Sequence, residues 1–277
     1  MEWLRGISQE RRALEDLYAF AVRIALEAGK RLAQAHGTVT RSTVNYKGWR
    51  NLVTELDVEV EQLLISRIRE RYPADSIRAE EGGGDRPGAE LQSASSRRWV
   101  IDPLDGTTNY VHRHPFYCVS IGVEDVSGPL LGVIYAPRLE ELFTASRGQG
   151  ATLNGEPIRV SGEGELSRSL LASGFAYAHG TDEDQNLRNW ARLASKCRGL
   201  RRCGSAALDL AYVADGRYDG FWELGLNPWD VAAGAILVQE AGGTVTDCAG
   251  GPSYHDGASI AASNARIHAQ LLENLTF

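Results

Sequence analysis

Apolar residues recur at helical spacing in the first quarter of the chain. Over residues 12–36 they fall on one face of a predicted helix, and Gly37 is a suitable stop. A second amphipathic helix is predicted after N-L-V-T-E-L-D, and the pair Tyr72-Pro73 ends it. The segment S-I-R-A-E-E then predicts a short strand that reaches an acid, Glu80.

Short strands dominate the middle of the chain. Between Trp99 and about Val160 the strands are W-V-I-D, F-Y-C-V-S-I-G-V-E, L-L-G-V-I-Y-A-P and E-L-F-T-A-S, separated by turns. The segment N-G-E-P-I-R-V adds a turn and an edge strand. This pattern predicts an antiparallel meander.

Beyond Ser169 strands alternate with helices, which indicates stacked α and β layers. The helices are predicted over residues 182–196, 205–215 and 229–241, and from Asn264 to the end. We therefore expect one layered α/β domain over residues 11–277, with lobes at about 11–165 and 166–277. The first lobe contains the antiparallel meander, and the second is a smaller α/β lobe.

Composition narrows the class of protein. The chain has 277 residues, 43% hydrophobic and 23% charged, which is typical of a globular protein with a sizeable core. The formal net charge of -7 argues against nucleic acid as a partner. No signal peptide or membrane span is evident, and the four cysteines lack a C-x-x-C pair. We expect reduced thiols, a cytoplasmic location and no membrane partner.

The candidate chemistry begins where the predicted strand W-V-I ends in two acids, Asp102 and Asp105. Pro103 lies between them, removes a backbone donor and sets the turn. A plain surface turn would use the same residue types. Two carboxylates that converge on one point would repel each other, and a bound cation would relieve that repulsion.

Two further acidic residues lie at the ends of predicted helices or strands. Asp230 lies just inside a predicted helix N-terminus, where it could serve only as a cap, and Glu80 could be a solvated surface acid. With Asp102 and Asp105 these side chains offer hard oxygen ligands, and no cysteine or histidine set lies near. Such ligands favour Mg²⁺, with Mn²⁺ as a substitute, over zinc. Two divalent ions would balance the charge of the four carboxylates, and we expect two or three ions at the site.

Two segments about 125 residues apart carry a family resemblance. The string R-R-W-V-I-D-P-L-D-G-T-T-N and the string W-D-V-A-A-G-A-I-L-V-Q-E-A-G-G resemble the two signatures of the inositol monophosphatase family. The resemblance extends from about Leu14 to the last predicted helix. It implies a five-layered αβαβα sandwich of the sugar phosphatase type, usually a homodimer. It also implies a Mg²⁺-dependent, lithium-sensitive phosphatase that acts on a small phosphate ester.

The resemblance assigns roles to particular residues. The implied metal ligands are Glu80, Asp102, the backbone carbonyl of Leu104, Asp105 and Asp230. The implied nucleophile is a metal-activated water at the site of Asp102, oriented by Thr107 with Asp57 as its partner in a relay that acts as base. Asp57 could also cap the second helix.

Substrate contacts are implied as well. The backbone of Gly106 and Thr107 would hold phosphate oxygens, near Asp230. Gly204, Ser205 and Ala206 would contact the ring of a sugar or cyclitol, and Glu223 would accept hydrogen bonds from its hydroxyls. Lys47 stands where the family has a loop lysine near the metals, although a solvated lysine would look the same. Residues 82–84 are three glycines, which predict a loose loop after Glu80.

The string D-G-T-T-N favours the inositol-phosphatase branch of the family. We therefore predict a Mg²⁺-dependent phosphomonoesterase that hydrolyses inositol-1-phosphate or a related sugar or polyol phosphate. The alternative enzyme is a broad-specificity fructose-1,6-bisphosphatase/inositol monophosphatase. A binding-only regulator of transcription is the alternative from another class. Both the full set of acids and the negative net charge oppose it.

Overall fold

The structure is a computed structural model that describes residues 2–37, 44–46, 52–85, 96–175 and 185–276. The described helices are α1 (Glu2–Ala35), α2 (Glu55–Arg71), α3 (Thr107–Val111), α4 (Gln185–Ala194), α5 (Ala206–Ala214), α6 (Pro228–Glu240), α7 (His268–Leu272) and the 3-10 helix η2 (Leu166–Arg168). The strands of the first part are β1 (Val44–Tyr46), β2 (Leu52–Thr54), β3 (Ser76–Ala79), β4 (Arg97–Asp105), β5 (Cys118–Asp125), β6 (Gly128–Ala136), β7 (Glu141–Ser146), β8 (Gly150–Leu153) and β9 (Glu156–Ile158). Those of the second part are β10 (Leu170–Ser173), β11 (Gly199–Arg201), β12 (Gly220–Leu224), β13 (Thr244–Thr246) and β14 (Ser259–Ser263).

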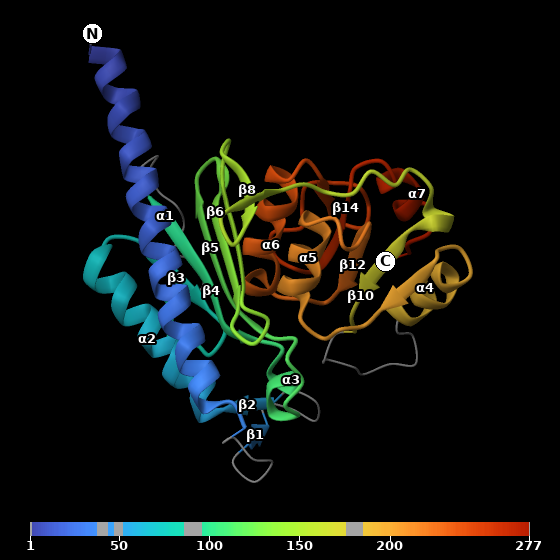
Figure 1. Cartoon of the computed structure of the whole chain (residues 1–277), viewed down its shortest axis with the longest axis horizontal. Coiled ribbons are helices and arrows are strands. Elements are labelled where there is room, and N and C mark those ends of the chain that lie inside the picture. The colour runs from blue at the N-terminus through green and yellow to red at the C-terminus, as the bar shows by residue number, and fades with distance from the viewer. Residues whose placement is uncertain (1, 38–43, 47–51, 86–95, 176–184, 277) are drawn as a thin grey trace.

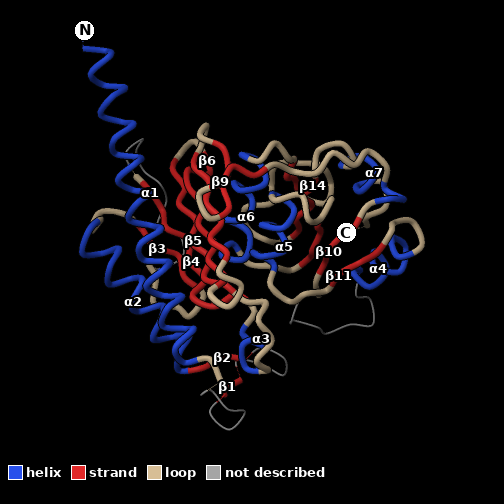
Figure 2. The backbone as a smooth tube through the Cα atoms, in the orientation of Figure 1, coloured by secondary structure: helices blue, strands red, loops and turns tan. Residues whose placement is uncertain are grey.

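The elements stack in alternating helical and sheet layers (Figure 1). Helices α1 and α2 cover one face of a seven-stranded sheet with the order β3-β4-β5-β6-β7-β8-β9. Helices α5 and α6 lie between this sheet and a five-stranded sheet, β11-β10-β12-β14-β13. Helices α4 and α7 lie beyond the second sheet, as the tube view in Figure 2 also shows. The predicted αβαβα layering is confirmed.

Strand pairing in the large sheet follows the predicted meander. Strands β4 to β9 pair in sequence order and antiparallel, while β3 joins the edge parallel to β4. The ladder between β4 and β5 shifts register between Asp102 and Asp105. Pro103 lies in this gap and has no N–H to donate, so the strand bulges there. The bulge turns both aspartates toward the same end of the sheet.

Two helices begin four or more residues away from the predicted start. Helix α1 begins at Glu2, well before residue 12. Helix α7 begins at His268 and not at Asn264, because the Asn264 side chain accepts the N–H groups of Arg266 and Ile267 and Ala265 has φ 68°. That local turn competes with helix formation. No helix in the described part of the chain has the length and apolar composition needed to cross a bilayer.

Helix α6 is the central element because it packs against both sheets. Its side chains are apolar around most of the circumference, as expected for a helix enclosed on all sides. Glycines of the large sheet let it approach closely: a Cβ at Gly132 would lie 2.6 Å from the carbonyl oxygen of Ala233. A Cβ at Gly122 would lie 2.7 Å from the Cβ atom of Ala232. This close packing fixes the first turn of α6 beside the end of β4.

Candidate metal and phosphate site

The aspartates at the end of β4 are held by short hydrogen bonds. Asp102 Oδ1 accepts the backbone N–H of Leu104 at 2.9 Å. Asp105 Oδ2 accepts the Ser205 hydroxyl at 2.6 Å and the backbone N–H of Ala207 at 2.8 Å. Both aspartates are buried, and in each one the other carboxylate oxygen has no hydrogen bond recorded in the described structure. The turn and the start of α5 therefore orient the carboxylates and leave oxygens for a ligand.

Asp230 reaches the same place from the first turn of α6. Its Oδ2 accepts the backbone N–H of Asn227 at 2.7 Å, so the side chain does cap the helix. Asp102, Asp105 and Asp230 each also present an oxygen to a common point, with these oxygens all within 4.8 Å of one another. Bonds of about 2.1 Å to Mg²⁺ span oxygens up to roughly 4.2 Å apart, so small side-chain rotations suffice to bind it.

The electrostatics of this cluster call for a cation. Burial, followed by repulsion from Glu80, Asp105 and Asp230, raises the pKa of Asp102 well above its usual value. Burial and the nearby Asp105 act in the same way on the pKa of Asp230, and burial raises the pKa of Asp105 to about 6. Within the described chain, no arginine or lysine forms an ion pair with these three aspartates. Divalent ions fit this donor set, which consists of hard oxygens alone.

Glu80 lies at the rim of the site, just after β3. It is half-buried, lines a pocket with Asp105 and Asp230, and helps to raise the pKa of Asp102. The three-carboxylate cluster among the described residues does not include it, so it stands farther out than Asp102, Asp105 and Asp230. A ligand role for Glu80 would require its side chain to move inward when an ion binds.

The loop after Glu80 is not loose, and that prediction is wrong for residues 81–85. The buried Glu61 of α2 accepts the backbone N–H of Glu81 at 2.5 Å and that of Gly83 at 2.8 Å. Gly84 packs so closely on β3 that a Cβ there would lie 2.6 Å from the Ile77 carbonyl oxygen. The glycines permit tight packing of the loop against α2 and β3.

Thr107 and its predicted partner are in contact. The Thr107 hydroxyl lies 3.1 Å from Asp57 Oδ1 and 3.0 Å from the carbonyl oxygen of Leu104. Asp57 is fully buried in the first turn of α2. Because α2 begins at Glu55, Asp57 is the third residue of the helix and not its N-cap, so that alternative is wrong. Gly106 precedes α3 with φ 94°, and a Cβ there would lie 3.0 Å from the Phe116 carbonyl oxygen. A glycine is therefore required at this turn.

The predicted substrate residues line a pocket that opens on the carboxylate cluster. Its wall includes Gly204, Ser205, Ala206 and Glu223, together with Asp105 and Asp230. Glu223 is buried, and burial followed by repulsion from Asp230 raises its pKa well above the usual value. Glu223 lies directly against Gly174, where a Cβ would overlap its carboxylate. Lys47 lies outside the described residues.

Three further residues of this pocket were not predicted. Asp209 of α5 is 1% exposed, and its Oδ1 has no hydrogen-bond partner among the described residues. Arg202 is the basic residue of the wall, and it partly offsets the elevated pKa values of Asp209 and Glu223. Gly174 makes room for Glu223. An acid within the apolar run A-A-L-D-L-A-Y-V-A was the available signal for Asp209.

Comparison with known proteins agrees with the fold. The sequence model of the inositol monophosphatase family matches residues 13–277. Nus factor SuhB of Escherichia coli (strain K12) is 43% identical, covering 92% of this chain and 94% of that protein. The structure of an inositol monophosphatase from Anabaena (Nostoc) sp. PCC 7120 superposes with a TM-score of 0.83 at 42% identity, covering 95% of this chain and 96% of that one. Inositol monophosphatase II of Staphylococcus aureus MSSA476 gives a TM-score of 0.77 at 26% identity, covering 94% and 93%.

The family match, the layered fold and the carboxylate cluster agree. The family and the solved neighbours support a phosphatase, and the acidic cluster is suited to bind metal ions. The chain belongs to the inositol monophosphatase family.

Proposed function

We propose that the protein is a Mg²⁺-dependent phosphomonoesterase that hydrolyses inositol-1-phosphate or a related sugar or polyol phosphate. The observation that carries this proposal is the convergence of Asp102, Asp105 and Asp230 at the mouth of a pocket that also contains Glu223. A metal centre beside hydrogen-bond acceptors suits a substrate with a phosphate at one end and hydroxyl groups at the other.

The three aspartates would hold the ions, with the Leu104 carbonyl and Glu80 as further oxygen donors. When bound, Mg²⁺ neutralises phosphate charge and lowers the pKa of a coordinated water toward neutrality. The hydrogen bonds from Leu104 N–H, Ser205 and Ala207 N–H keep the Asp102 and Asp105 carboxylates in fixed orientations. Ligands oriented in this way lose little freedom on binding, which raises metal affinity.

Thr107 and Asp57 would form the base. The Thr107 hydroxyl would take a proton from the attacking water as it passes its own proton to Asp57, which is 3.1 Å away. Asp57 is buried in the first turn of α2, so its carboxyl group is held beside the threonine. Asp102 would also help to position this water.

Substrate recognition would follow from the rest of the pocket. In this proposal the backbone N–H groups of Gly106 and Thr107, which follow Asp105 directly, would bind phosphate oxygens, and Glu223 in the pocket wall would accept hydrogen bonds from ring hydroxyls. Gly204, Ser205 and Ala206 have small side chains that leave space for a ring. A solved neighbour, SaIMPase-II, is described as bound to inositol monophosphate and, separately, to 2'AMP. That range supports a polyol or sugar phosphate here without selecting one.

Phosphate release from a panel tests the proposal. The substrates are inositol-1-phosphate, fructose-1,6-bisphosphate, histidinol phosphate and 3'-phosphoadenosine-5'-phosphate, each with Mg²⁺, with Mg²⁺ and Li⁺, or with EDTA. We expect Mg²⁺-dependent release, greatest for inositol-1-phosphate, and competition by Li⁺. Equal rates with fructose-1,6-bisphosphate would favour the broad-specificity alternative. Rates unchanged by EDTA would contradict the mechanism.

The same proposal includes a homodimer, which sedimentation of the purified chain tests directly. A single species with the mass of the monomer at micromolar concentration would contradict it.

A second candidate function comes from the names of the relatives. The E. coli relative and others at 39–43% identity are named Nus factors or putative Nus factors. A role in transcription, with protein or nucleic-acid partners, is therefore a candidate in addition to catalysis. A transcription assay in a strain that lacks this protein separates the two, because Asp102→Asn should abolish phosphate release and leave a binding role intact.

A further inference from the structure

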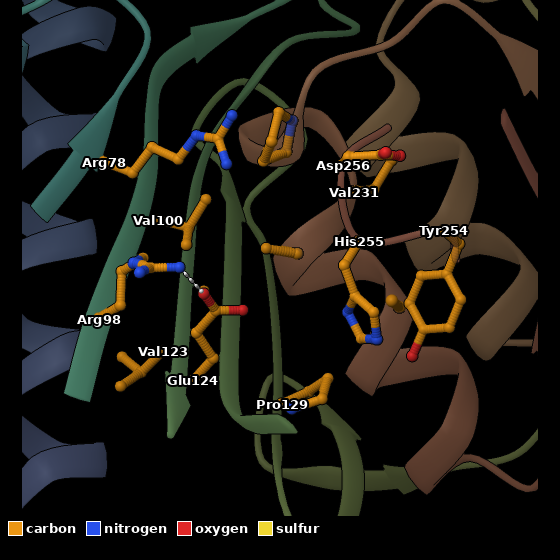
Figure 3. A pocket seen from close by; sticks show the side chains of 14 residues that line it. Arg78, Arg98, Val100, Val123, Glu124, Pro129, Val231, Tyr254, His255 and Asp256 are labelled. Carbon is orange, nitrogen blue, oxygen red and sulfur yellow. Dashed lines mark hydrogen bonds and ion pairs between the residues drawn. The ribbon is translucent and has the colours of Figure 1, made fainter. Parts of the chain in front are cut away.

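A second pocket lies between the large sheet and α6 (Figure 3). It has a volume of about 170 Å³ and shares no lining residue with the pocket at the carboxylate cluster. Its apolar floor comes from both elements: Val100 of the sheet, and Val231, Ala232 and Ala235 of α6. An apolar cavity of about 150 Å³ holds a ligand the size of benzene, so this pocket suits a small hydrophobic group.

The mouth of the pocket carries one unpaired charge of each sign. Arg78 of β3 is exposed, lies over the Trp229 ring at 6.0 Å and has no ion pair within the described part of the chain. Asp256 is also exposed, and its recorded contact is the N–H of Ala258 at 3.0 Å. Figure 3 shows Arg78 directed into the gap from the sheet, and Asp256 on the loop across it. Each of these side chains can form an ion pair with a ligand without breaking an existing ion pair.

The other charged groups of the pocket are already matched. Arg98 and Glu124, on adjacent strands, form an ion pair of 3.1 Å, drawn as a dashed line in Figure 3. They cancel each other at the sheet wall. Arg78 and Asp256 are therefore the pair that sets the charge preference of the pocket.

The loop that carries Asp256 is firmly placed. The buried Tyr254 accepts a hydrogen bond from the Gln239 amide at 2.8 Å, and its ring lies 4.1 Å from that of His255. Gly257 has φ 79°, and a Cβ there would lie 2.6 Å from the Asn227 backbone. The loop is packed against both ends of α6, so the wall of the pocket exists before any ligand arrives. A preformed wall reduces the entropy lost on binding.

We propose that this pocket binds a small zwitterion with an apolar side chain, of the kind that a branched-chain amino acid provides. The ligand carboxylate pairs with Arg78, its ammonium group pairs with Asp256, and its side chain packs on the valines and alanines of the floor. The site is independent of the proposed phosphatase function and uses none of its residues.

Calorimetric titration of the full-length protein tests the proposal, with L-leucine as the probe. Two analogues each lack one charge: 4-methylpentanoate has no ammonium group, and 3-methylbutylamine has no carboxylate. Loss of one charged contact weakens binding by about tenfold, so both analogues should bind about tenfold more weakly than leucine. The variants Arg78→Gln and Asp256→Asn should each weaken leucine binding by about tenfold. Both residues are exposed, so the variants should fold.

Selectivity makes the test specific. Arg78→Gln should not weaken binding of 3-methylbutylamine, and Asp256→Asn should not weaken binding of 4-methylpentanoate. Arg12→Gln, which changes an exposed arginine on α1, is the control and should bind leucine as the unmodified protein does. No leucine binding, equal binding of 4-methylpentanoate, or unchanged binding in either pocket variant would each overturn the proposal.

Discussion

Thr107 Oγ1 and Asp57 Oδ1 lie 3.1 Å apart, although 50 residues separate them in the chain. Thr107 is the first residue of α3, directly after the turn that carries Asp105. Asp57 is in the first turn of α2, which packs on the opposite face of the large sheet from α6. The contact therefore joins the outer helical layer to the site at the end of β4.

Removal of either partner should slow the reaction without loss of metal. We expect Thr107→Val and Asp57→Asn each to lower kcat by about 10² to 10⁴, the range for general base catalysis. Because the two act as one unit, the double variant should be no more than a few fold slower than either single variant. Steady-state kinetics with inositol-1-phosphate check this. Effects that multiply in the double variant would show that the two residues act independently.

Ser205 should act through Asp105, which we propose as a metal ligand. Ser205→Ala removes the 2.6 Å hydrogen bond to Asp105 Oδ2 and leaves the bond from Ala207 N–H. Loss of such a support typically weakens metal binding by about 10- to 100-fold. Calorimetric titration with Mn²⁺ measures it. Ser195→Ala, a change at an exposed serine, is the matched control, and equal affinities in both variants would contradict the role given to Ser205.

The buried carboxyl of Asp105 predicts a pH-dependent response to metal. Burial raises its pKa to about 6, so the folded protein holds this proton more tightly than the unfolded chain. In the absence of metal, the free energy of unfolding should therefore decrease as the pH rises from about 4 to about 6, by roughly 3 kcal/mol from this group. Below pH 4 the group is protonated in both states and adds no further slope.

Mg²⁺ binds the ionised form, so it should raise the Tm strongly at pH 8 and only slightly at pH 5. Calorimetric melting with Mg²⁺ and with EDTA at both pH values measures this difference. In Asp105→Asn the dependence on pH should become shallower. An equal Mg²⁺-induced rise at pH 5 and pH 8 would be inconsistent with a buried carboxylate cluster.

Gly174 should control the position of Glu223. The Cβ added by Gly174→Ala would overlap the Glu223 carboxylate, so that side chain must turn away from the pocket. We expect a KM for inositol-1-phosphate about tenfold higher, because at least one hydrogen bond to the ring is lost. Hydrolysis of para-nitrophenyl phosphate, which has no ring hydroxyls, is the control and should change little. A KM that rises equally for both substrates would place the effect at the phosphate or the metals.

Local sequence patterns predicted most of the fold because its elements are long or strongly periodic. The meander from β4 to β9 follows from alternating apolar residues and short turns, and α6 from its apolar length. The start of α7 was missed because Asn264 forms its own hydrogen bonds to Arg266 and Ile267. A propensity argument does not foresee which of two local hydrogen-bonding patterns wins.

The sequence predicted the site residues that belong to a local motif. It did not predict the contacts between elements that are distant in the sequence. Asp102, Asp105 and Asp230 lie together as the two motifs suggested. The tight loop after Glu80 was not foreseen, because Glu61 of α2 holds it from 20 residues away. The roles of Asp209 and Gly174 likewise depend on neighbouring residues of other strands and helices. No local sequence pattern specifies these neighbours.

The most direct test of the metal site is anomalous diffraction from crystals soaked in Mn²⁺. The account predicts strong peaks within about 2.3 Å of carboxylate oxygens of Asp102, Asp105 and Asp230, with Glu80 drawn toward one of the ions. The Asp102→Asn variant should lose at least one peak, whereas Glu156→Gln, at an exposed position on β9, should keep all of them. Well-ordered crystals with no manganese peak at these three aspartates would contradict the account.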